Sequence, residues 1–179
     1  MDIFEIVLLA VALGIDCMVV SFAQGVIYKD NRFRNSVLLA LTMGLFQGIM
    51  PCIGYFGATP IYEYIEAYSY LIVFAIFTLL GVKFILDAFR KKPVKLCHIS
   101  TNCLISIGVA TSMDALIAGA SIKFSQAELL SPAIIIGVIS FIMAFIGFWA
   151  GNTCVKLPSK YLEIIGGIIL IILGIKALI

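Results

Sequence analysis

ALGIDCMVVSFA, residues 12–23, and ATSMDALIAGAS, residues 110–121, are two similar stretches that decide the fold of this 179-residue chain. Each stretch carries a single aspartate, Asp16 or Asp114, in the middle of a much longer apolar segment. A helix needs about 20 apolar residues to cross a hydrocarbon layer of roughly 30 Å. We therefore expect both stretches to lie in membrane-spanning helices.

The rest of the chain is as apolar as these two stretches. Hydrophobic residues make up 63% of the chain and charged residues 12%, whereas a soluble domain has roughly 45–50% and about 25%. This composition excludes a soluble globular protein and a disordered chain. Six apolar segments are long enough to cross a membrane, at about residues 4–27, 36–57, 66–86, 101–122, 132–153 and 161–178. The predicted fold is an all-α integral membrane protein, in which residues 1–179 form one domain within the lipid bilayer.

The similarity between the two halves extends beyond the aspartates. Two further pairs of segments correspond at an offset of 93 residues: 44–57 with 137–150, and 79–86 with 172–179. We therefore divide the chain into repeat one, at about residues 1–92, and repeat two, at about residues 98–179. Since each repeat has three helices, the two repeats must cross the membrane in opposite orientations. Inverted repeats of this kind are typical of secondary transporters, whose site lies at the repeat interface near the midplane.

The basic residues predict the orientation. Connections after the first, third and fifth segments hold nine of the twelve: Lys29, Arg32, Arg34, Arg90, Lys91, Lys92, Lys95, Lys156 and Lys160. The other connections hold only Lys123, and Lys83 and Lys176 are expected near helix ends, where they can snorkel. Positive charge marks the cytoplasmic side, so both termini are expected outside. Basic residues confined to short loops give no reason to expect nucleic acid as a partner.

Asp16 and Asp114 are the two acidic residues at the centres of apolar segments. A charge at the bilayer centre costs at least about 2.5–3.5 kcal/mol, and we expect no basic residue at the same depth to neutralise either carboxylate. Each aspartate must then be protonated, hydrogen-bonded to a neighbouring helix, or bound to a cation. A two-fold axis between the repeats would bring both carboxylates toward one midplane site.

Small polar residues around these aspartates favour a divalent cation. Gln47 is a candidate ligand because Pro51 cannot donate a hydrogen bond to its backbone carbonyl, although Gln47 could equally form an interhelical hydrogen bond. The candidate metal ligands are Asp16, Asp114, Gln47, Thr111, Ser112 and Ser21. Oxygen ligands favour Mg²⁺, Ca²⁺ or Mn²⁺. Met18 and Met113 would favour a softer ion, unless they serve only in packing.

The five cysteines are expected to be structural. Disulfides are not expected in apolar spans or in a cytoplasmic loop. Cys97, His98 and Cys103 match no zinc-binding spacing. We expect no resident cofactor.

At this point the sequence resembles a known family. ALGIDCMVVSFAQG at 12–25, ATSMDALIAGASI at 110–122 and GLFQGIMPCIG at 44–54 are similar to the motifs of MntP-type manganese efflux pumps. The resemblance implies export of Mn²⁺ from the cytoplasm across the bacterial cell (inner) membrane, with Asp16 and Asp114 as the motif acids. Cys17 stands where the family usually has alanine, and some members have an acid near the position of Gln47.

The expected function is therefore secondary transport by alternating access, with protons as the coupling ion, and not an enzymatic activity. No GxxxxGK[ST] loop is present to supply nucleotide energy. Two alternatives are a passive divalent-cation channel and an intramembrane aspartyl protease, whose GxGD and YD motifs differ from the LGID and TSMD found here. The chain could act as a monomer or as a homodimer.

Overall fold

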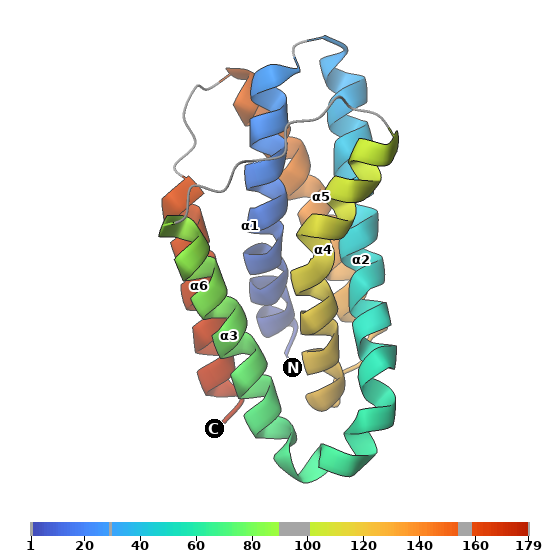
Figure 1. Cartoon of the computed structure of the whole chain (residues 1–179), viewed down its shortest axis with the longest axis vertical. Coiled ribbons are helices and arrows are strands. Elements are labelled where there is room, and N and C mark those ends of the chain that lie inside the picture. Colours follow the sequence, from blue (N-terminus) through green and yellow to red (C-terminus); the bar gives the residue numbers. More distant parts are fainter. Residues whose placement is uncertain (1, 29, 90–100, 154–158, 179) are drawn as a thin grey trace.

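The computed structural model describes residues 2–28, 30–89, 101–153 and 159–178, which are helical with no strand among them. Six α-helices follow one another along these residues: α1 (Ile3–Ile27), α2 (Arg32–Ile65), α3 (Ser69–Phe89), α4 (Thr101–Phe124), α5 (Leu130–Thr153) and α6 (Ser159–Lys176). A short 3₁₀ turn, Glu66–Tyr68, joins α2 to α3 (Figure 1). The all-α class and the approximate position of each predicted segment are confirmed.

Five of these helices, α1 to α5, are long and apolar enough to cross a membrane. The sixth, α6, is only 18 residues long and carries three charged residues, Lys160, Glu163 and Lys176. Large apolar side chains, Ile49, Ile53 and Ile146 among them, are more than half exposed on the outside of the bundle. An apolar exterior over several long helices makes this chain a multi-pass membrane protein.

Helix α2 is longer than the predicted segment of residues 36–57. It begins at Arg32 and continues through Pro51 and Pro60 to Ile65. Hydropathy falls at both ends because of charged and aromatic residues, but the helix itself does not stop there. Proline is tolerated within membrane helices because neighbouring helices can satisfy the freed carbonyl groups.

The helices are arranged so that each one packs mainly against a helix from the other half of the chain. The principal partner of α1 is α5, and that of α4 is α2. Helices α2 and α5 also pack together, and α3 packs along α6, with smaller contacts from α3 to α4 and from α6 to α1. Both termini lie at the end of the bundle that also holds the α2–α3 turn (Figure 1). Hence α1, α2, α4 and α5 form a four-helix bundle, and α3 and α6 form a pair beside it.

Glycines bring the two halves into close contact. A Cβ atom at Gly44 on α2 would lie 2.9 Å from the carbonyl oxygen of Gly137 on α5, and one at Gly137 would lie 3.0 Å from the carbonyl oxygen of Gly44. These positions correspond at the offset of 93 residues. In the same way, Gly54 of α2 lies against α4, and Gly147 of α5 lies against α1. Only residues without a side chain permit such close approach of helix backbones.

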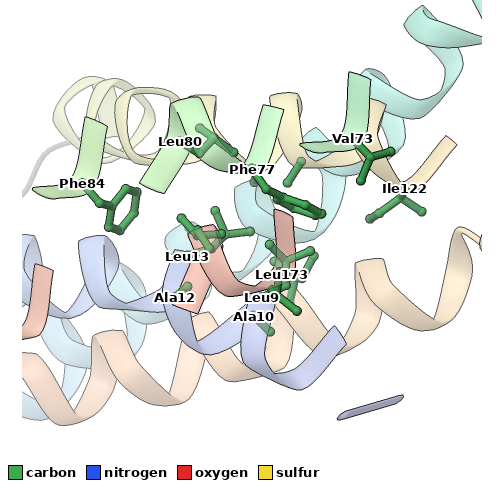
Figure 2. Packing of buried hydrophobic residues seen from close by; sticks show 14 of the residues in the cluster. Leu9, Ala10, Ala12, Leu13, Val73, Phe77, Leu80, Phe84, Ile122 and Leu173 are labelled. Atoms are coloured by element: carbon green, nitrogen blue, oxygen red, sulfur yellow. The ribbon is translucent and has the colours of Figure 1, made fainter. Parts of the chain in front are cut away.

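A hydrophobic cluster joins α1 to the α3–α6 pair. Leu9 and Leu13 of α1 meet Phe77 and Leu80 of α3 and Leu173 of α6, all nearly inaccessible (Figure 2). A second cluster, which includes Cys17, Met43 and Phe148, fills the four-helix bundle nearer its other end. The polar residues predicted to bind metal therefore lie in a part of the helix bundle that is otherwise filled by apolar side chains.

Candidate metal site

Gln47 is fully buried and links three helices of the bundle. Its amide nitrogen, Nε2, lies 3.3 Å from the backbone oxygen of Thr111 on α4 and 3.3 Å from the Sγ atom of Cys17 on α1. Cys17 directly follows Asp16 on α1. The structure therefore brings Gln47, Thr111 and the Asp16 segment together.

Two buried oxygens at this place accept no hydrogen bond from the described residues. They are Oε1 of Gln47 on α2 and Oγ of Ser140 on α5. Ser140 also faces the thiol of Cys17, but its hydroxyl forms no hydrogen bond of normal geometry there. A buried oxygen without a partner costs about 1–3 kcal/mol. Such oxygens are available to a bound cation or a water molecule.

Ser140 was not among the predicted ligands. It lies 93 residues after Gln47, which is the offset that relates the two predicted repeats. Extending the repeat comparison from the aspartates to Gln47 would have found it. The site is thus approached by α1, α2, α4 and α5.

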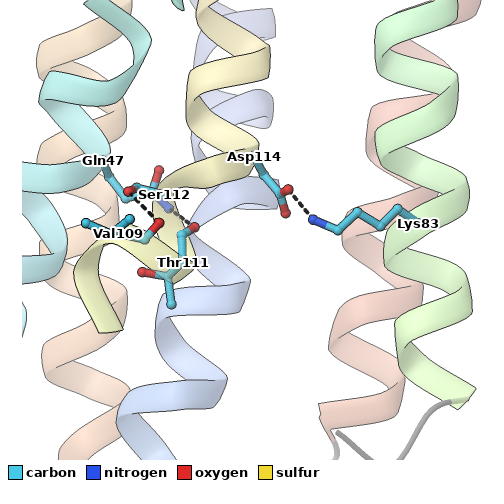
Figure 3. Close-up of polar contacts among 6 residues, drawn as sticks. All are labelled: Gln47, Lys83, Val109, Thr111, Ser112 and Asp114. Atoms are coloured by element: carbon cyan, nitrogen blue, oxygen red, sulfur yellow. Dashed lines mark hydrogen bonds and ion pairs between the residues drawn. The ribbon is translucent and has the colours of Figure 1, made fainter. Parts of the chain in front are cut away.

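Asp114 has a different environment from the one expected. Its carboxylate forms an ion pair with the ammonium group of Lys83 on α3, and it points toward α3 while Gln47 approaches α4 from the opposite side (Figure 3). The Asp114 side chain is 8% exposed and that of Lys83 is 45% exposed. The expectation that no basic residue lies at this depth is therefore wrong.

The reason is the length of α3 and its place in the fold. The predicted segment ended at residue 86, but the helix continues to Phe89, so Lys83 lies well inside its last two turns. Helix α3 also runs beside α4 in the opposite direction (Figure 1). The side chain of Lys83 consequently reaches across to Asp114 instead of extending along its own helix to the membrane surface.

The predicted hydroxyl ligands are all buried. Thr111 Oγ1 donates to the carbonyl of Ile107 at 3.0 Å, and Ser112 Oγ donates to that of Gly108 at 2.7 Å. Ser21 lies one turn from Cys17 on α1, where its hydroxyl donates to Sδ of Met43 at 3.6 Å. Each hydroxyl oxygen keeps its acceptor lone pairs. Thr111 adjoins Gln47, whereas Ser21 lies beside a different turn of α2.

Carboxylates alone cannot form a metal site here. No group of three or more His, Cys, Asp or Glu side chains comes together within the part of the chain that the structure describes. A cation at this place would need neutral oxygens in addition to a carboxylate. Met113 is 53% exposed on the outer surface of α4, which fits a packing role.

The cysteines give one correction. Cys103 is disulfide-bonded, so the expectation that the chain has no disulfide is wrong at this position. That expectation rested on the redox state of the compartment. Cys97, His98 and Cys154 lie outside the described residues.

A second group of charges lies at the end of the bundle that holds the termini. Lys176, the repeat counterpart of Lys83, forms an ion pair with Glu5 of α1 and lies 3.7 Å from Asp2. A cavity of about 400 Å³ opens beside this ion pair, with Phe77 of α3 and Phe124 of α4 in its wall. Each of the two equivalent lysines therefore contacts an acidic residue on the first helix of the opposite repeat.

Comparison with known proteins identifies the family of this chain. The family described as "Putative manganese efflux pump" matches residues 30–178. A "Putative manganese efflux pump MntP" from Bacteroides thetaiotaomicron is 39% identical over 183 residues, covering 98% of this chain and 95% of that relative. A relative of the same name from Methanocorpusculum labreanum is 37% identical, and the match covers 96% of this chain and 92% of that relative. Another from Crocosphaera subtropica is 33% identical, and the match covers 100% of this chain and 96% of that relative. No solved structure matches. The chain belongs to the MntP family of manganese efflux pumps.

Proposed function

We propose that this protein exports Mn²⁺ from the cytoplasm across the cell (inner) membrane. The observation that carries the proposal is the pair of buried oxygens, Gln47 Oε1 and Ser140 Oγ, that lack hydrogen-bond donors beside the Asp16 segment. Membership of the family and the names of its relatives supply the metal and the direction. Carboxylate and neutral oxygen ligands suit Mn²⁺ as well as Mg²⁺ and Ca²⁺.

The proposed ligands are Asp16, Asp114, Gln47, Thr111, Ser112 and Ser21, to which we add Ser140. Asp16 supplies negative charge on the α1 side, and the oxygens of Gln47 and Ser140 supply neutral ligands from equivalent places in the two repeats. Asp114 can join them only after it turns away from Lys83.

Alternating access between two inverted repeats is the proposed mechanism, with six membrane-spanning helices and both termini outside. Equivalent helices of the two halves pack against equivalent helices of the other half: α1 packs on α5, and α4 packs on α2. This symmetric packing supports the inverted repeats. The reciprocal contact of Gly44 and Gly137 supports them further. In this orientation the cavity beside Glu5 and Lys176 lies on the outer side and offers Mn²⁺ an exit.

Protons are the proposed coupling ion. Expelling a divalent cation against 100 mV costs about 4.6 kcal/mol, since each charge accounts for about 2.3 kcal/mol. Protons and metal ions compete for the same carboxylate oxygens, so inward proton movement on Asp16 and Asp114 can offset this cost. A passive channel would instead let Mn²⁺ run down its gradient.

Transport by the purified protein in liposomes tests the proposal. With an imposed proton gradient, the full chain should accumulate Mn²⁺ above the external concentration. Accumulation should disappear when a protonophore is added. Equilibration without accumulation would show a channel, and no Mn²⁺ movement under either condition would contradict the proposed function. Replacement of the exposed loop residue Glu128 by glutamine is a matched control that should change nothing.

A further inference from the structure

We propose that Lys83 is a counter-cation for Asp114. Its ammonium group pairs with the carboxylate of Asp114 while no Mn²⁺ is bound, and Mn²⁺ must displace it in order to bind. This inference rests on the proposed function and assigns a positioning role to a residue outside the proposed ligand set. The ion pair between the two side chains joins α3 to α4 in the structure. Asp114 is buried, whereas Lys83 extends from a helix beside the four-helix bundle (Figure 3).

The charges at the site explain why the two cations exclude each other. The ion pair of Lys83 with Asp114 is electrically neutral. A divalent cation that binds Asp114 while Lys83 stays would add two uncompensated positive charges, whereas departure of Lys83 would remove one of them. Uncompensated charge is strongly disfavoured inside a membrane. Metal binding and release of Lys83 from Asp114 are therefore expected to occur together.

In the empty carrier Lys83 has the opposite effect. A buried carboxylate that loses its partner is strongly destabilised. By pairing with Asp114, the ammonium group of Lys83 compensates the charge of that buried carboxylate. The same contact holds Asp114 on the α3 side of α4, away from Gln47.

The position of Lys83 also connects metal binding to a larger part of the protein. Helices α3 and α6 are closely packed, because a Cβ atom at Gly81 or at Gly167 would lie 2.6 Å from the carbonyl oxygen of the other glycine. This pair contacts the bundle through Lys83 to Asp114 and through Lys176 to Glu5. When Mn²⁺ releases Lys83, one of these two polar links is lost. The α3–α6 pair is then freer to move relative to the bundle.

The two equivalent lysines are not interchangeable in this scheme. Lys83 pairs with a mid-helix aspartate, whereas Lys176 pairs with Glu5 close to the start of α1. Only Lys83 competes with the metal. Lys176 therefore provides a matched control for the removal of a lysine from the same position in the repeat.

The experiment compares Mn²⁺ binding by the purified full-length protein with its turnover in liposomes. Lys83→Met should bind Mn²⁺ at least about tenfold more tightly, a difference of about 1.4 kcal/mol, and should transport more slowly because release is impeded. Lys83→Arg retains a cation and should bind Mn²⁺ no more tightly than the wild type. Lys176→Met should leave Mn²⁺ affinity unchanged.

The outcomes separate this inference from the proposed function. If the wild type binds Mn²⁺ and Lys83→Met binds it equally or less tightly, the counter-cation role is wrong and the proposed function stands. If the wild type binds no Mn²⁺, both are wrong. A second measurement needs no variant: the reactivity of Lys83 toward a membrane-permeant amine reagent, read by mass spectrometry, should rise when Mn²⁺ is added. Unchanged reactivity at saturating Mn²⁺ would overturn the inference.

Discussion

Replacing Gln47 by leucine separates metal binding from stability. The substitution keeps the approximate volume and removes two long hydrogen bonds, each 3.3 Å, from Nε2 to Thr111 and Cys17. Interhelical hydrogen bonds in membranes are worth about 0.6 kcal/mol each, so about 1.2 kcal/mol is lost. Removal of the unpartnered Oε1 atom restores about 1–3 kcal/mol. The folded protein should therefore be as stable as the wild type or slightly more stable.

Metal affinity should respond in the opposite way. An interaction between a polar group and a charge is worth about 1.5–3 kcal/mol, which corresponds to a roughly ten- to hundredfold loss of Mn²⁺ affinity. Thermal unfolding, monitored by size-exclusion chromatography, would measure stability. Titration of the same samples with Mn²⁺ would measure affinity. Ser140→Ala should weaken binding less, because a water molecule can replace its small hydroxyl group.

A matched control is available in α1. Gln24 is also fully buried, two turns from Asp16 along the helix, and Gln24→Leu makes the same chemical change at a residue outside the proposed ligand set. This variant should keep Mn²⁺ affinity. Unchanged affinity in Gln47→Leu, together with a clear loss of stability, would show that Gln47 is only an interhelical hydrogen-bonding residue.

Two further predictions concern packing and orientation. Gly44→Ala should destabilise the protein by about 1–3 kcal/mol, because its Cβ atom would lie 2.9 Å from the carbonyl oxygen of Gly137. Gly48→Ala should be tolerated, because the nearest atom to its Cβ atom would lie 3.4 Å away. Equal thermal stability of the two variants would contradict the close contact between Gly44 and Gly137. In a cysteine-free background, Glu128→Cys should react with an impermeant thiol reagent in intact cells, whereas Asp30→Cys should react only after the membrane is opened; the reverse pattern would place the termini inside.

The sequence was sufficient for those features that depend on composition and local pattern. Long apolar segments predicted the helices, and the two aspartates stood out because charge is rare inside such segments. These properties depend on residues that are close in the sequence or equivalent between the repeats.

Other features depend on which helices are neighbours in the fold. The sequence alone does not show which helices these are. The pairing of Lys83 with Asp114 requires α3 to lie beside α4 and to continue past residue 86, where hydropathy gave no reason to extend it. Ser140 has an ordinary apolar surrounding sequence, so only its equivalence to Gln47 distinguishes it.

The most direct test of the account is Mn²⁺ export by Asp16→Asn and Asp114→Asn. Asparagine has nearly the same shape as aspartate and still forms hydrogen bonds, but it carries neither the charge nor the exchangeable proton. Each variant should fold, reach the membrane in normal amounts and fail to accumulate Mn²⁺ in liposomes, and cells that depend on it should become sensitive to manganese. Wild-type accumulation by either variant would contradict a site built on the two carboxylates.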